Sequence, residues 1–408
     1  MPSKYGGVST GWPTKTELDA AHRIQQHFSA EIARLKDPSR DVVGDLRIVR
    51  FIRARHGNEQ EAREWYGEFL KVRTEKPEIE EKIRPSVIGM TPEQYLQFFN
   101  ERKHPGFPVC PYAGETDDGQ VLMVVRTGMV DPVDFTENRG NVPLEDEELL
   151  ILSMLEWTLW YIDEMSWKRH EMVYVIKLMD FNGLGGGGRK LPIFVPKMKQ
   201  LLVGLLEAAQ KPYCEHDALF LATNTPFLFR AVKSVIFLLL TAKQKSKFNV
   251  LGYTTDQAVC RKILEILPAR IVPEALGGSR ATLPGVYPLA DVSSELSGWL
   301  QRRQDPGFMW RVFEKPVAVS VAAPPADKEP TTGAPSTAAT DSVSQVVESS
   351  PLTPTVLEVT TAQQVLVVGD AKDLAAKGVA LPADDEPSFV SLEGQESAQA
   401  CSCCAMAG

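Results

Sequence analysis

The longest glycine run in the chain has the spacing of a phosphate-binding loop. Gly183 to Gly188 fits the pattern GxGxxG, and Glu207 lies downstream as a nominal ribose ligand. In a dinucleotide site the pyrophosphate binds at the N-terminus of the helix that opens within the loop. Here Pro192 and Pro196 postpone the helix, and the Lys-Ser/Thr pair of a Walker loop is missing. A strand-to-helix connection is therefore favoured, and a nucleotide-dependent enzyme is the alternative.

The histidines and cysteines form no catalytic or metal-binding motif. His104, His170 and His216 have no serine or cysteine at motif spacing, and neither H-E-x-x-H nor a paired C-x-x-C occurs. Cys214 lies close to His216, but closeness in sequence does not give the geometry of a thiolate pair. We therefore expect no catalytic residue, no metal and no cofactor, which indicates a binding protein and not an enzyme.

The negative charge of the chain belongs to its C-terminal part. The 408 residues have a formal net charge of −9, and residues 317–408 contain 12 acidic and 3 basic side chains. The first 316 residues contain 41 of each, so they lack the basic surface expected of a nucleic-acid-binding domain. The sequence contains no stretch of about 18 uncharged apolar residues, which is the length needed to span a bilayer. The N-terminus has no signal-peptide apolar core, and we expect a cytoplasmic protein.

Hydrophobic spacing predicts helices first and then strands that alternate with helices. Helices are expected over residues 16–35, 45–55 and 58–74, and together they form a small bundle. Strands are expected over 121–126, 172–181, 218–223 and 248–252, helices over 144–166, 191–209, 226–241 and 256–267, and a loop over 110–119. This alternation indicates the α/β class, with a parallel or mostly parallel sheet and helices on its faces.

Four short motifs follow one another along the chain. They are LRIVRFIRAR at 46–55, MDFNG at 179–183, TNTP at 223–226 and LPARIVPEALGG at 267–278. Together they resemble the CRAL-TRIO family, the lipid-binding fold of phosphatidylinositol-transfer proteins. The resemblance implies a helical bundle followed by a mostly parallel sheet, which is flanked by helices and encloses an apolar lipid pocket.

The resemblance and the composition together divide the chain into five parts. They are a flexible arm (1–14), an N-terminal helical bundle (15–85), a CRAL-TRIO-like domain (86–290), an extension that packs on this domain (291–316) and an acidic tail (317–408). The tail is rich in Ala, Pro, Ser, Thr and Val, so it cannot bury enough apolar surface to offset its ordering entropy, and we expect it to be disordered.

In this family a movable gate helix closes the lipid pocket, and the segment after the TNTP motif resembles it. Its apolar face consists of Phe227, Phe229, Val232, Val235, Ile236, Leu239 and Leu240. Transfer of a phospholipid into water costs too much free energy, because its acyl chains would be exposed. Exchange therefore requires this apolar face to enter the membrane interface. The alternative is a helix that stays packed on the sheet.

The resemblance also implies which residues bind the lipid headgroup. Members that take phosphatidylinositol have a Glu nine residues before the Asn of the TNTP-like turn and a Lys 23 residues after it, which are Glu215 and Lys247 here. The lysine would pair with the phosphate, and the glutamate would accept from inositol hydroxyls or orient the lysine. Arg53 or Arg55 would add to this side. The alternative for Lys247 is a solvated charge in the run Lys243, Lys245, Lys247.

Two departures from the family pattern affect the headgroup. His216 stands where an Arg usually follows the Glu, which weakens the anion site. Members that also carry phosphatidylcholine place small hydroxyl residues at positions that here are Val175 and Lys177. Lys177 either faces an anionic ligand group or extends from a strand end to water.

Three cysteines lie at the end of the tail, namely Cys401, Cys403 and Cys404. They suit reversible S-acylation, for which the alternatives are metal or redox chemistry and neutral drift. We expect a protein that binds one phospholipid or similar amphiphile, with phosphatidylinositol favoured, and that associates peripherally with membranes. A lipid-sensing adaptor that recruits protein partners through its tail is the second alternative.

Overall fold

The computed structural model of the chain describes Tyr5 and most residues from 8 to 310. The described ranges are 8–36, 38–130, 133, 144–184, 195–197, 200, 212–225, 242–288, 292–305 and 307–310. The chain divides into two units, Met1–Ala322 and Ala323–Gly408, and the second lies outside these ranges.

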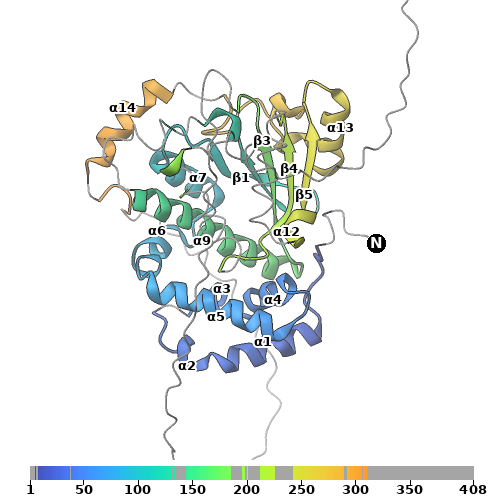
Figure 1. Cartoon of the computed structure of the whole chain (residues 1–408), viewed down its shortest axis with the longest axis vertical. Coiled ribbons are helices and arrows are strands. Elements are labelled where there is room, and N and C mark those ends of the chain that lie inside the picture. Colours follow the sequence, from blue (N-terminus) through green and yellow to red (C-terminus); the bar gives the residue numbers. More distant parts are fainter. Residues whose placement is uncertain are drawn as a thin grey trace, which may run out of the picture. The chain divides into compact units, whose positions relative to one another are not determined.

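Short helices make up the N-terminal part (Figure 1). They are α1 (Lys15–His27), α2 (Ser29–Ile32), α3 (Arg40–Val43), α4 (Asp45–Ala54), α5 (Glu59–Glu75), the π-helix η1 (Ile79–Ile83), α6 (Arg84–Val87) and α7 (Pro92–Arg102). Thr14 caps α1 in a capping box with Glu17, and Asn58 caps α5 by accepting from the Glu61 N–H. The helix expected over 16–35 is interrupted at Phe28, where α1 ends and α2 begins.

Five strands form one sheet in the order β1-β2-β3-β4-β5. They are β1 (Val109–Glu115), β2 (Val121–Val125), β3 (Val175–Asp180), β4 (Asp217–Thr223) and β5 (Phe248–Gly252). β1 pairs with β2 antiparallel and the other neighbours are parallel, so the predicted mostly parallel sheet is confirmed. The loop predicted over 110–119 is wrong for residues 110–115. These residues belong to β1, an edge strand that tolerates Pro111 and an irregular register before Gly114.

Helices pack on both faces of the sheet. α9 (Leu144–Arg169) lies against one face, where Trp157 and Leu155 share a core with Met123 and Val175. α13 (Gln257–Ile266) lies against the other, where Ile263 packs with side chains such as Leu178. Figure 1 shows α9 in green between the sheet and the helices α1, α3, α4 and α5. The remaining short elements are η2 (Thr127–Met129), α12 (Ala242–Ser246), η5 (Ala269–Ile271), η6 (Glu274–Leu276) and α14 (Val292–Arg303).

The described residues of the N-terminal arm differ from the expected flexible segment. Tyr5 and Val8 are each only 2% exposed. The Tyr5 hydroxyl donates to Asp118 at 2.6 Å, and Trp12 packs edge-on against Trp167. Burial of these apolar side chains and the hydrogen bond to Asp118 oppose the ordering entropy of the arm.

The segment after the sheet also packs on the helices. Trp299 of α14 is fully buried, and its indole N–H donates to the Arg102 carbonyl at 3.0 Å. The Arg102 guanidinium in turn donates to the Met309 carbonyl at 3.0 Å.

Buried arginines join the N-terminal helices to α9. The sequence places Arg47 and Arg50 on the stripe opposite the apolar residues of α4, but both stripes are buried. Arg47 and Arg50 each donate to one carboxylate oxygen of Asp163 at 2.7 Å. A second buried network joins Arg73 and Arg84 to Asp41, Glu80 and Glu156.

Replacing Asp163 by Ala leaves two buried guanidinium groups without their shared counter-ion. We expect the free energy of unfolding to fall by about 3 to 5 kcal/mol. The neighbouring Glu164 is the matched control, because it pairs with Arg40, whose side chain is 55% exposed. Glu164→Ala should cost less than about 1 kcal/mol. Chemical denaturation of both variants measures the difference, and equal losses would contradict the importance of the buried pair.

Candidate functional site

The two faces of the sheet differ in how completely they are covered. Side chains alternate between the faces along a strand, and cross-strand neighbours share a face. On the α13 face, Ile176, Leu178 and Leu221 are fully buried. On the other face two rows of neighbours cross the sheet, Met123–Lys177–Phe220–Phe248 and Val125–Met179–Ala222–Val250.

The part of these rows on β3 to β5 is mostly apolar and only partly covered. Lys177, Met179, Phe220 and Phe248 are half-buried, and Val250 is 42% exposed. The Phe220 and Phe248 rings stack with centroids 5.7 Å apart, and the Lys177 ammonium lies 5.2 Å from the Phe220 ring centroid. This part of the sheet is therefore an apolar surface with one cation on it, and we call it the β3–β5 floor.

Charged side chains gather where β4 and β5 begin. The two carboxylate oxygens of Glu215 contact different lysines, Lys243 at 2.8 Å and Lys247 at 3.2 Å. Lys247 also donates to the Asp217 carbonyl at 2.6 Å. We call Glu215, Lys243 and Lys247 the lysine–glutamate cluster. Parallel pairing of β4 with β5 brings these residues together from separate parts of the chain.

Residues of α4 contact the lysine–glutamate cluster and hold it in position. The Arg50 guanidinium donates to the Glu215 carbonyl at 3.2 Å, and Glu215 has a left-handed backbone with φ of 54°. Lys243 donates to the Arg53 carbonyl at 2.5 Å, near the C-terminus of α4, where the helix dipole is negative. Because Arg50 is itself held by Asp163, the buried ion pairs also fix this corner of the site.

A second charged group lies beside the cluster. The Lys177 ammonium is 3.0 Å from Asp217 Oδ2 and 3.5 Å from His216 Nε2. Burial lowers the pKa of His216 to about 4, and the nearby Lys177 and Lys247 lower it against the opposing effect of Asp217. His216 is therefore neutral at pH 7, with Nδ1–H toward the Tyr213 carbonyl. Its Nε2 lies 3.1 Å from Asp217 Oδ2, and the Lys177 ammonium contacts both atoms.

The structure brings together four of the six predicted headgroup residues, namely Glu215, Lys247, His216 and Lys177. Arg53 and Arg55 direct their side chains elsewhere. Arg53 pairs with Glu17 at 2.7 Å and donates to the Ser9 carbonyl, and Arg55 pairs with Glu61 beside the Trp65 ring.

Lys243 and Asp217 were missed as site residues. The sequence signal for Lys243 is its position four residues before Lys247 in a lysine run. Asp217 could have been found from its position two residues after Glu215, at the start of β4.

Several predicted residues lie outside the described ranges. These are the gate-helix residues Phe227, Phe229, Val232, Val235, Ile236, Leu239 and Leu240, the cysteines Cys401, Cys403 and Cys404, and the glycine run beyond Leu184.

The family motifs hold the carboxyl ends of the strands together. Asp180 accepts from the Asn224 side chain at 2.8 Å and from the Tyr287 hydroxyl at 2.6 Å. Asn224 in turn accepts from the Thr254 N–H at 2.8 Å. A Cβ at Gly278 would lie 2.0 Å from the Val272 carbonyl oxygen, so only glycine fits there. These residues have structural roles.

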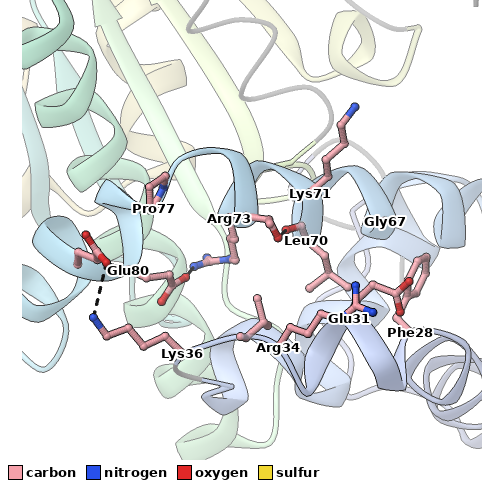
Figure 2. Close-up of a pocket in the computed structure, with 13 residues that line it drawn as sticks. Phe28, Glu31, Arg34, Lys36, Gly67, Leu70, Lys71, Arg73, Pro77 and Glu80 are labelled. Carbon is pink, nitrogen blue, oxygen red and sulfur yellow. Dashed lines mark hydrogen bonds and ion pairs between the residues drawn. The ribbon is translucent and has the colours of Figure 1, made fainter.

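A separate groove of about 420 Å³ lies among the N-terminal helices (Figure 2). Phe28, Leu35 and Leu70 form its apolar part, and the charged residues at its side include the pairs Lys36–Glu81 and Arg73–Glu80. None of the predicted headgroup residues lines it.

The described part of the chain contains neither a membrane span nor a metal-binding cluster. No helix there has the length and apolar character needed to cross a membrane. No group of three or more His, Cys, Asp or Glu side chains there is arranged to hold a metal ion.

The fold and the floor with its charged end define an α/β domain suited to an amphipathic ligand. Residues 108–278 match the family model described as the CRAL/TRIO domain. The chain therefore contains a CRAL/TRIO domain, which confirms the resemblance that its motifs indicate, and lipid binding is the general activity of this class.

A solved structure titled "Crystal structure of Sfh5" is similar at 14% identity with a TM-score of 0.47, and the similarity covers 72% of this chain and 98% of that one. No curated protein matches the chain.

The depressed pKa of His216 predicts a loss of stability in mild acid. The unfolded histidine takes up a proton near pH 6.5, whereas the folded one resists protonation until about pH 4, so the unfolded state gains protons first as the pH falls. We expect the His216 contribution to the free energy of unfolding to be roughly 2 to 3 kcal/mol smaller at pH 4.5 than at pH 7.

Denaturant unfolding of the wild type and His216→Gln at both pH values measures this contribution. The exposed His27 provides the control, since His27→Gln should keep the wild-type pH dependence. If His216→Gln shows the same pH dependence as the wild type, the buried neutral histidine is not its source.

Proposed function

We propose that the protein binds one phospholipid, with phosphatidylinositol favoured, on the β3–β5 floor and exchanges or presents it at membranes. The observation that carries this proposal is the division of the floor into an apolar part and a charged end. Met179, Ala222 and Val250 lie toward the carboxyl ends of their strands, whereas the lysine–glutamate cluster lies where β4 and β5 begin. An amphiphile has the same division, with acyl chains at one end and a charged headgroup at the other.

The energetics support exchange at a membrane and not through water. Roughly 30 methylenes at 0.8 kcal/mol each make transfer of a phospholipid into water cost on the order of 20 kcal/mol. The segment 227–240, predicted as a gate helix, is proposed as the cover that opens on a bilayer.

The proposal also includes a location and partners for the protein. We propose a cytoplasmic protein without enzymatic activity that associates peripherally with membranes. Acylation of Cys401, Cys403 or Cys404 would strengthen the association, and the acidic tail would recruit any protein partners.

Lys247 is the residue proposed to contact the phosphate. It is buried and already holds Glu215 and the Asp217 carbonyl, so its ammonium group is fixed in position. Loss of one charge-assisted hydrogen bond costs about 1.5 to 3 kcal/mol. Lys247→Met should therefore reduce phosphatidylinositol loading at least tenfold.

Native mass spectrometry after incubation with mixed phosphatidylinositol and phosphatidylcholine vesicles measures this loading. Lys262→Met, an exposed lysine on α13, should load like the wild type. A wild-type protein that takes up no phospholipid contradicts the proposed function. Unchanged loading of Lys247→Met would instead remove that lysine from the headgroup site.

A further inference from the structure

The lysine–glutamate cluster contains one more cation than anion. Lys243 and Lys247 share a single carboxylate, that of Glu215, in a mostly buried position where the three side chains are 20%, 4% and 5% exposed. The adjacent charges balance among themselves. Lys177 pairs with Asp217, and His216 is neutral. The four buried arginines of the two networks described above face four carboxylates, namely Arg47, Arg50, Arg73 and Arg84 against Asp41, Glu80, Glu156 and Asp163. Among the described residues, the side chains of the cluster therefore carry a formal charge of +1, which the negative C-terminal end of α4 offsets only in part.

Both lysines also retain hydrogen-bonding capacity. An ammonium group has three N–H donors. Lys243 uses one on Glu215 and one on the Arg53 carbonyl, and Lys247 uses one on Glu215 and one on the Asp217 carbonyl. One donor on each lysine thus has no partner among the described residues, and the two donors flank the same carboxylate.

A buried, uncompensated cation is unstable unless an anion neutralises it. Burial lowers the pKa of Lys243, and the neighbouring Lys247 lowers it further although Glu215 opposes both. A singly charged anion would leave the cluster neutral. A doubly charged phosphomonoester would overcompensate it, and a zwitterion would add a further cation.

We propose that Lys243 is a specificity-determining residue, which with Lys247 selects a singly charged phosphodiester headgroup over zwitterionic and doubly charged ones. This inference rests on the proposed function and adds to it the charge of the accepted headgroup. Lys243 acts together with Lys247 on the two non-bridging oxygens of the phosphodiester, while Glu215 keeps the two ammonium groups side by side.

The first test uses soluble headgroups and the full chain, so that it does not depend on uptake of acyl chains. Isothermal titration calorimetry is run with glycerophosphoinositol, inositol 1-phosphate and glycerophosphocholine. The wild type should bind glycerophosphoinositol most tightly. Lys243→Gln should weaken this binding about tenfold and remove the preference, because the remaining pair of Lys247 and Glu215 is neutral.

Two variants control for charge and for the fold. Lys243→Arg keeps the charge and should retain most of the affinity. Lys245→Gln removes an exposed lysine from the same helix and should bind like the wild type. Thermal unfolding temperatures of all three variants should lie within a few degrees of the wild type, since no fully buried group is removed.

Vesicle assays separate this inference from the proposed function. If the wild type takes up phosphatidylinositol and Lys243→Gln keeps the same preference over phosphatidylcholine, the role of Lys243 is wrong and the proposed function stands. If the wild type takes up no phospholipid, the proposed function fails, and the calorimetry still decides whether the cluster binds a phosphodiester. Equal affinity of the wild type for all three soluble headgroups overturns the inference.

Discussion

A charge that is removed from water must be compensated within the protein, and this constraint determines how the N-terminal helices lie against the sheet. Arg47 and Arg50 of α4 are buried, and both reach Asp163 of α9. Arg50 also donates to the carbonyls of Val173 and Glu215. The position of α4 therefore fixes Glu215, the carboxylate of the lysine–glutamate cluster. Hydrophobic packing alone would allow α4 to slide or rotate, whereas the planar guanidinium groups accept few arrangements. The N-terminal helices are thus part of the framework of the site.

The sequence was sufficient for the fold class because its strands and helices alternate with clear hydrophobic periods. It was insufficient for β1, since Pro111 and Gly114 are residues of loops, and only pairing with β2 at a sheet edge explains them as a strand. It was also insufficient for the N-terminal arm. Tyr5 and Val8 are too few to give a periodic pattern, and their burial depends on contacts with distant residues such as Asp118.

The charged residues show a similar limit. Glu215, His216, Lys247 and Lys177 could be predicted together only through the family resemblance. The structure places the first three directly before β4 and β5, beside Lys177 of β3. Arg53 and Arg55 could not be placed, because the direction of a side chain at a helix end depends on what lies beside it. Arg53 contacts the N-terminal arm, which has no pattern in the sequence. The carbonyl of Arg53, which any residue would supply, is the group that meets Lys243.

The difference between the two sheet faces separates stability from binding. The α13 face is filled by the protein's own side chains, and burial there contributes to folding. On the β3–β5 floor, Met179, Phe220, Phe248 and Val250 stay partly exposed. These side chains therefore contribute less to the free energy of folding than the buried ones on the α13 face. A sequence that needed only stability would cover these side chains or make them polar. The proposed ligand would supply what the floor and the lysine–glutamate cluster each lack, an apolar body and one negative charge.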